Sequence, residues 1–96
     1  MSSLPESSIR KQVDQYLTLR GWYCWATHSH DGIHRPSVGG LSDFEAVKDG
    51  EFIAVEVKSD KGKLRPAQVE HAKGLSESGI RFIVCRSVED LKRQGI

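Results

Sequence analysis

Residues 41–58 read Leu-Ser-Asp-Phe-Glu-Ala-Val-Lys-Asp-Gly-Glu-Phe-Ile-Ala-Val-Glu-Val-Lys, and this stretch decides the fold. It holds two strand-like runs, 41–48 and 51–58, on either side of Asp49-Gly50, a dipeptide that favours a two-residue type I′ hairpin turn. Alternation along the two runs places the apolar residues on one face: Phe44, Ala46, Ile53, Val55 and Val57. The stretch therefore predicts an antiparallel hairpin that packs one face against the core.

The register of this hairpin follows from the turn. If Asp49-Gly50 are the two turn residues, Lys48 faces Glu51, and counting outward places Asp43 opposite Glu56. Directly opposed strand residues have Cβ atoms roughly 5 Å apart, and like charges in that position destabilise a sheet. Two facing carboxylates therefore need a compensating partner.

A divalent cation would be such a partner. Asp43 and Glu56 offer hard oxygen ligands, which suit Mg²⁺ or Mn²⁺. Lys58 lies two residues beyond Glu56, so strand alternation points its ammonium toward the same face. There it could orient a water molecule or stabilise charge on a phosphate. The alternative is a solvated hairpin edge with an ordinary Glu-Lys pair.

The elements predicted on either side of the hairpin give the fold class. A helix is expected over 5–20, with Ser3 and Glu6 as a capping box at its start. The remaining elements are a strand over 22–27, a helix opened by Pro66 and stopped by Gly79, a strand over 80–85 and a short helix after Ser87. The order α-β-β-β-α-β-α predicts an α/β fold, in which a mixed sheet is flanked by helices.

Length and composition limit the class of protein. The 96 residues fit one domain, 1–96, and 38% hydrophobic with 28% charged residues is ordinary for a globular protein. No apolar run approaches the roughly 20 residues that cross a bilayer. The first residues lack the features of a signal peptide, so we expect a cytoplasmic protein with no membrane partner. The two cysteines lack the spacing of a zinc site or a redox pair.

Two cationic stretches occur, although the net charge is only +1. The first contains Lys58, Lys61, Lys63 and Arg65, and the second contains His28, His30, His34 and Arg35. Either stretch could contact phosphates, and either could be a solvated loop. A zinc site on the three histidines is a further alternative, but their spacing matches no closed four-ligand pattern.

Two residues on the predicted helices could extend the carboxylate pair. Glu6 precedes Ile9 and Val13 by three and seven residues, so it falls on the apolar stripe and is expected to point inward. The capping box explains Glu6 equally well without a metal. Gln68 lies in the first turn of its helix, where it could orient a phosphate or water, or could instead bond to the preceding loop.

The longer pattern comprises Gly39-Gly40, Asp43, Glu56-Val57-Lys58, Gly62-Lys63-Leu64 and Gln68. With the helix start at Pro5-Glu6, it resembles the VRR-NUC family of the PD-(D/E)XK nuclease superfamily over nearly the whole chain. The resemblance implies a restriction-endonuclease-like core that uses Mg²⁺ or Mn²⁺. One departure is local, because the helix with Gln68 starts with Arg65-Pro66-Ala67, where a Ser or Thr cap is commoner.

The resemblance also implies a role for each residue of the site. The metal-binding residues it implies are Asp43, Glu56 and Glu6, with Val57 of the signature strand. Lys58 is the signature lysine, and Gln68 completes the catalytic set. Stand-alone phage and bacterial members are similar in shape to Holliday-junction resolvases, which favours branched DNA as the substrate.

We therefore expect a metal-dependent endonuclease that hydrolyses phosphodiester bonds in DNA. Phosphate contacts are expected from Lys61, Lys63, Arg65, Arg35 and His34. A small domain covers little duplex, so a branched target favours a homodimer, with Trp22, Tyr23 and Trp25 as interface candidates or as core residues. The alternative is a catalytically silent nucleic-acid-binding module of the same fold. No small-molecule cofactor is expected in either case.

Overall fold

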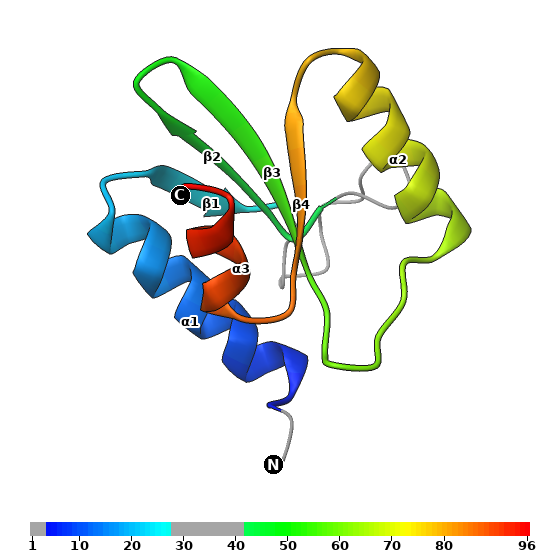
Figure 1. The fold of residues 1–96 in the computed structure, drawn as a ribbon, viewed down its shortest axis with the longest axis horizontal. Helices are drawn as coiled ribbons and strands as arrows, with labels where there is room; N and C mark the ends of the chain where they lie inside the picture. The colour runs from blue at the N-terminus through cyan, green and yellow to red at the C-terminus, as the bar shows by residue number, and fades with distance from the viewer. Residues whose placement is uncertain (1–3, 28–41) are drawn as a thin grey trace, which may run out of the picture.

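The computed structural model describes residues 4–27 and 42–96. Its elements are α1 (Glu6–Leu19), β1 (Tyr23–Ala26), β2 (Phe44–Lys48), β3 (Glu51–Val57), α2 (Pro66–Glu77), β4 (Arg81–Cys85) and α3 (Val88–Arg93). This order confirms the predicted succession of helices and strands. Figure 1 shows α1 and α3 close together, with α2 apart from them beside β4.

The four strands form one mixed sheet in the order β1-β2-β3-β4. The pairs β1/β2 and β2/β3 are antiparallel, and β3/β4 is parallel. Because β3 and β4 run in the same direction, a crossover must join them, and α2 provides it. The predicted α/β class with a mixed sheet and flanking helices is confirmed.

The hairpin adopts the predicted turn. Asp49 and Gly50 both have positive φ values, 50° and 81°, as a type I′ turn requires. Lys48 pairs with Glu51, and the ladder continues to Phe44 opposite Val55. The register expected from the sequence is therefore the register of the sheet.

One face of the sheet packs on α1 and α3 to form the core. Ile9, Val13 and Leu17 recur every four residues along α1 and are buried. They join the inward residues of the sheet, Phe44, Ala46, Ile53, Val55, Val57, Ile83 and Cys85, together with Leu91 of α3. After α1, Gly21 turns the chain at a φ of 89°, in the left-handed region that glycine tolerates.

The predicted cap of the first helix is wrong. The N-cap is Pro5, in an extended conformation and without a side-chain cap, and Glu6 is the first residue of α1 and not the third. Pro5 has no N–H and a fixed φ, which suits a residue that leads into a helix. Ser3 lies outside the described residues.

The opposite face of the sheet is incompletely covered. The helix α2 contains no buried residue, and Val69 of its apolar stripe is 48% exposed. Trp22 is buried in the core, whereas Tyr23 and Trp25 of the edge strand β1 are 76% and 37% exposed. The core interpretation thus holds for Trp22 alone. Within the described ranges, no helix has the length and apolar character to cross a membrane.

The contribution of the α1 stripe can be measured with a leucine pair on the same helix. Leu17→Ala removes a fully buried side chain and leaves a cavity. We expect the free energy of unfolding to fall by about 2–5 kcal/mol in urea denaturation. Leu19→Ala, at a position that is 84% exposed, should change it by less than about 0.5 kcal/mol. Equal effects of the two substitutions would contradict this packing.

Candidate active site

Asp43 lies immediately before β2, at the open end of the hairpin. Its Oδ2 atom accepts a hydrogen bond from the backbone N–H of Val57 at 2.8 Å. Its own backbone carbonyl accepts a bond from the N–H of Thr27 at 3.0 Å. These bonds hold Asp43 between β1 and β3, one residue beyond the Phe44–Val55 pair. The pairing of β2 with β3 ends at Phe44–Val55, and the Asp43 carboxylate beyond it lies close enough to Glu56 to raise the pKa of that group.

Glu56 is a buried carboxyl group, with only 4% of the residue exposed. Its Oε2 atom lies 3.6 Å from the Lys58 ammonium and accepts a hydrogen bond from Gln68 Nε2 at 3.0 Å. Burial, and then repulsion from Asp43, raises the pKa of Glu56 to about 7, while Lys58 acts in the opposite direction. Near neutral pH the Glu56 side chain is therefore partly protonated and partly ionised.

Lys58 is held where β3 leaves the sheet. Its backbone N–H donates to the Cys85 carbonyl at 3.1 Å, which extends the parallel pairing with β4. Its side chain passes close to Gly62, where an added Cβ would lie 3.4 Å from Lys58 Cδ and 3.2 Å from Ser59 Oγ. The loop after β3 therefore confines the lysine and directs its ammonium at Glu56.

Arg86 fixes that loop, and the sequence interpretation did not include it. Its Nη1 donates to the backbone carbonyls of Ser59 and Gly62, both at 2.6 Å. A guanidinium that bonds two carbonyls of one loop restricts how far the loop can move. Arg86 directly follows β4, but nothing in the sequence links it to a loop more than twenty residues earlier.

Gln68 bonds the loop that precedes α2, which is one of the two roles that the sequence left open, and it also contacts Glu56. Its Oε1 accepts a hydrogen bond from the backbone N–H of Arg65 at 2.8 Å, which closes the start of α2 in place of a Ser or Thr cap. Its Nε2 donates to Glu56 at 3.0 Å. The amide therefore links the helix start to the buried carboxyl group.

Glu6 does not join the two carboxylates directly. Its side chain is half-buried, with 38% exposed, and it reaches the loop after β3 and not the carboxylate pair. The cause is its place at the first position of α1, which brings it to the rim of the sheet. Its Oε1 accepts a bond from the Ser59 N–H at 3.4 Å.

Arg10 lies one helical turn after Glu6, and the sequence interpretation missed it too. Its Nη2 is 3.6 Å from Glu6 Oε2, and its Nε is 3.4 Å from Asp43 Oδ1. The i,i+4 spacing from Glu6 was the available signal, because residues so spaced meet on a helix surface. The second contact, to Asp43, depends on how α1 packs on the sheet.

The donors present fit a hard divalent cation that keeps much of its water. Among residues 4–27 and 42–96, no three His, Cys, Asp or Glu side chains gather closely enough to hold a metal ion. Asp43 and Glu56 remain as a close carboxylate pair. Mg²⁺ is commonly bound through one or two carboxylates with water completing the shell. The N–H of Val57 donates to Asp43. Only the main-chain oxygen of Val57 could coordinate a cation.

Three of the residues predicted to contact phosphate fall in the segment that follows Lys58. Lys61, Lys63 and Arg65 are exposed in the segment between β3 and α2. They follow Lys58 by three to seven residues. Arg35 and His34, with His28 and His30, fall outside the described residues.

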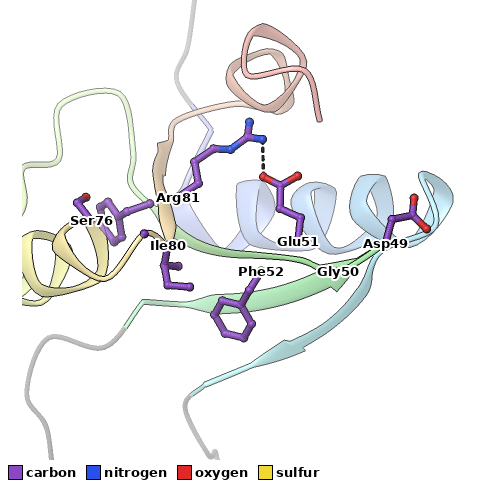
Figure 2. Close-up of a pocket in the computed structure, with 9 residues that line it drawn as sticks. Asp49, Gly50, Glu51, Phe52, Ser76, Ile80 and Arg81 are labelled. Carbon is purple, nitrogen blue, oxygen red and sulfur yellow. Dashed lines mark hydrogen bonds and ion pairs between the residues drawn. The ribbon is translucent and has the colours of Figure 1, made fainter.

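A hollow of about 840 Å³ lies at the other end of β3, between the hairpin turn and the start of β4. Figure 2 shows Phe52 and Ile80 at this hollow, with the ion pair between Arg81 and Glu51 at 2.5 Å. Its lining includes none of the predicted site residues. The carboxylate pair is therefore not part of this hollow.

Comparison with known proteins identifies the family. The family model of the VRR-NUC domain matches residues 33–89. Because this is more than half of the chain, the chain belongs to the VRR-NUC family, a family of PD-(D/E)XK nucleases, which generally use divalent metal ions. A solved structure described as a VRR_NUC domain superposes with a TM-score of 0.73 at 21% identity, over 92% of this chain and 90% of its own. That likeness supports the fold. None of the curated proteins matches.

The raised pKa of Glu56 predicts a specific pH dependence of stability. In the folded protein the pKa of Glu56 is about 7, against 4.5 for an ordinary glutamic acid side chain. The resulting stabilisation is complete below pH 4.5 and is lost as the pH rises to about 7. In chelator, the wild-type free energy of unfolding should therefore fall relative to that of Glu56→Gln across this range. A rise over the same range would contradict the assignment.

Proposed function

We propose that this chain is a Mg²⁺- or Mn²⁺-dependent endonuclease that hydrolyses phosphodiester bonds in DNA, with branched DNA such as a Holliday junction as its preferred substrate. The observation that carries the proposal is the pairing of Asp43 with buried Glu56, with the Lys58 ammonium 3.6 Å from the Glu56 carboxylate. Membership of a nuclease family supports the reaction class. The resemblance to resolvases supports the branched substrate.

Each residue of the group has a distinct part in this reaction. Asp43 and Glu56 would hold the cation, which when bound polarises a phosphoryl oxygen and lowers the pKa of a bound water. Lys58 would stabilise the charge that grows on the phosphate, a role that depends on its position. Gln68 keeps the Glu56 carboxylate oriented through its 3.0 Å bond. Glu6 lies at the edge of the site and would act indirectly, through its contacts with the Ser59 N–H and the Arg10 guanidinium.

Binding of DNA would rest on backbone phosphates and not on the bases. Lys61, Lys63 and Arg65 are exposed in the segment that follows Lys58, and Arg35 and His34 complete the proposed set. Contacts of this kind carry no sequence information and weaken as salt rises. The proposed enzyme therefore selects its substrate by shape.

A homodimer would supply two such sites to one branched substrate. The exposed aromatic face, defined by Tyr23, Trp25 and Phe52, lies on the sheet surface away from α1 and α3. Its ring centroids are 5.7 Å apart for Tyr23 and Trp25 and 6.0 Å apart for Trp25 and Phe52. Aromatic residues are enriched in protein interfaces. We propose this face as the contact between two copies related by a two-fold axis.

Cleavage by the purified protein tests the reaction. With Mg²⁺ or Mn²⁺ and a panel of four-way junctions, flaps and linear duplexes, the wild type should cut a branched substrate. Asp43→Asn and Lys58→Met should each lower the rate by about 100-fold or more, because each removes a group that acts in the transition state. Lys92→Met replaces an exposed lysine side chain on α3. This variant is the matched control and should cut the substrate at the wild-type rate. Binding without cutting of any substrate would instead identify a silent binding module.

Sedimentation tests the homodimer separately from the chemistry. The wild type should sediment as a dimer, and Tyr23→Ser or Trp25→Ser should shift the equilibrium toward the monomer without loss of the folded circular-dichroism spectrum. Leu19→Ser removes an exposed apolar side chain outside the aromatic face and should leave the dimer intact. A monomeric wild type, or a dimer that tolerates both aromatic substitutions, would refute this interface.

A further inference from the structure

Arg10 joins two carboxylates that belong to different elements of the fold. Its guanidinium approaches Glu6 on its own helix at 3.6 Å and Asp43, before β2, at 3.4 Å. The Asp43 side chain is only 11% exposed, whereas the Arg10 side chain is 38% exposed. The arginine therefore reaches from the solvent edge to a largely buried acid.

The contact between Arg10 and Asp43 is an ion pair without a hydrogen bond. The Arg10 Nε atom is shielded from solvent and has no hydrogen-bond partner in the part of the chain that the structure describes. Hydrogen bonds of this type have donor–acceptor distances of about 2.7–3.2 Å. Arg10 thus interacts with Asp43 through charge and not through a hydrogen bond. Its buried Nε donor has no partner, which carries an energetic cost.

Each of the two facing carboxylates has a positively charged side chain beside it in the metal-free protein. Asp43 and Glu56 repel each other, and this repulsion contributes to the raised pKa of Glu56. Lys58 pairs with Glu56, and Arg10 pairs with Asp43. Each carboxylate therefore has its own internal cation within the described residues. A divalent ion on Asp43 Oδ1 would meet the positive guanidinium at close range.

We propose that Arg10 is a positioning residue that takes the place of the divalent cation at Asp43 and competes with it. The inference rests on the proposed function, because it assumes that Asp43 binds a metal ion. Arg10 stabilises the metal-free protein by offsetting the charge of Asp43. The same contact lowers the affinity for metal, because Arg10 must release Asp43 Oδ1 before the ion can occupy that oxygen.

A neutral residue at position 10 should reverse both effects. In chelator, Arg10→Met should unfold at a lower temperature than the wild type. In calorimetric titration with Mn²⁺ alone, it should bind about twofold to fivefold more tightly, the range that loss of one partly exposed ion pair allows. Arg10→Lys keeps the charge and should remain near the wild type. Lys11→Met, exposed on the same helix, controls for the loss of one positive charge from the protein.

The outcomes separate the two proposals. If the wild type binds Mn²⁺ and Arg10→Met binds it no more tightly, competition is wrong and the proposed metal site stands. If neither protein binds Mn²⁺, the proposed metal dependence fails together with the inference. A metal-free Arg10→Met protein as stable as the wild type would also overturn it. Arg10→Gln provides a second neutral variant should Arg10→Met fold poorly.

Discussion

The positive φ angles of Asp49 and Gly50 determine which residues of β2 and β3 face each other, and the candidate site depends on that pairing. A slip of one residue would turn every side chain of a strand to the opposite face. Asp43 would then point into the core, and Glu56 would lose its neighbour. The bond from the Val57 N–H to Asp43 holds the same register at the far end of the hairpin. The turn and this bond together set the geometry of the two acids.

Neighbouring side chains offset the negative charge of Asp43 and Glu56. Burial and proximity make Asp43 and Glu56 costly to ionise together. The chain surrounds them with one ammonium, one guanidinium and one amide, each from a different element or loop. Such local conflicts, offset by neighbouring groups, are common at functional sites. The mutual repulsion of the two acids supports the proposed site for a doubly charged ion.

The features that the sequence predicted are those set by neighbours along the chain. The hairpin turn, its register and the order of elements depend on local patterns, and the structure agrees with each. The features missed are set by packing. Arg10 reaches Asp43 only because α1 crosses the end of the sheet, and Arg86 reaches Ser59 and Gly62 only because β4 lies beside β3. The exposure of Tyr23 and Trp25 likewise follows from the edge position of β1, which no strand pattern reveals.

The absence of any buried residue in α2 has a consequence for motion. A helix that buries little can open as a unit while the core on the other face of the sheet stays folded. Its amide hydrogens would then exchange with solvent much faster than those of α1, which carries three buried side chains. Gln68 moves with α2, so each opening event frees the Glu56 carboxyl from its amide partner. The orientation of the buried acid therefore depends in part on a helix that contributes no buried residue to the core.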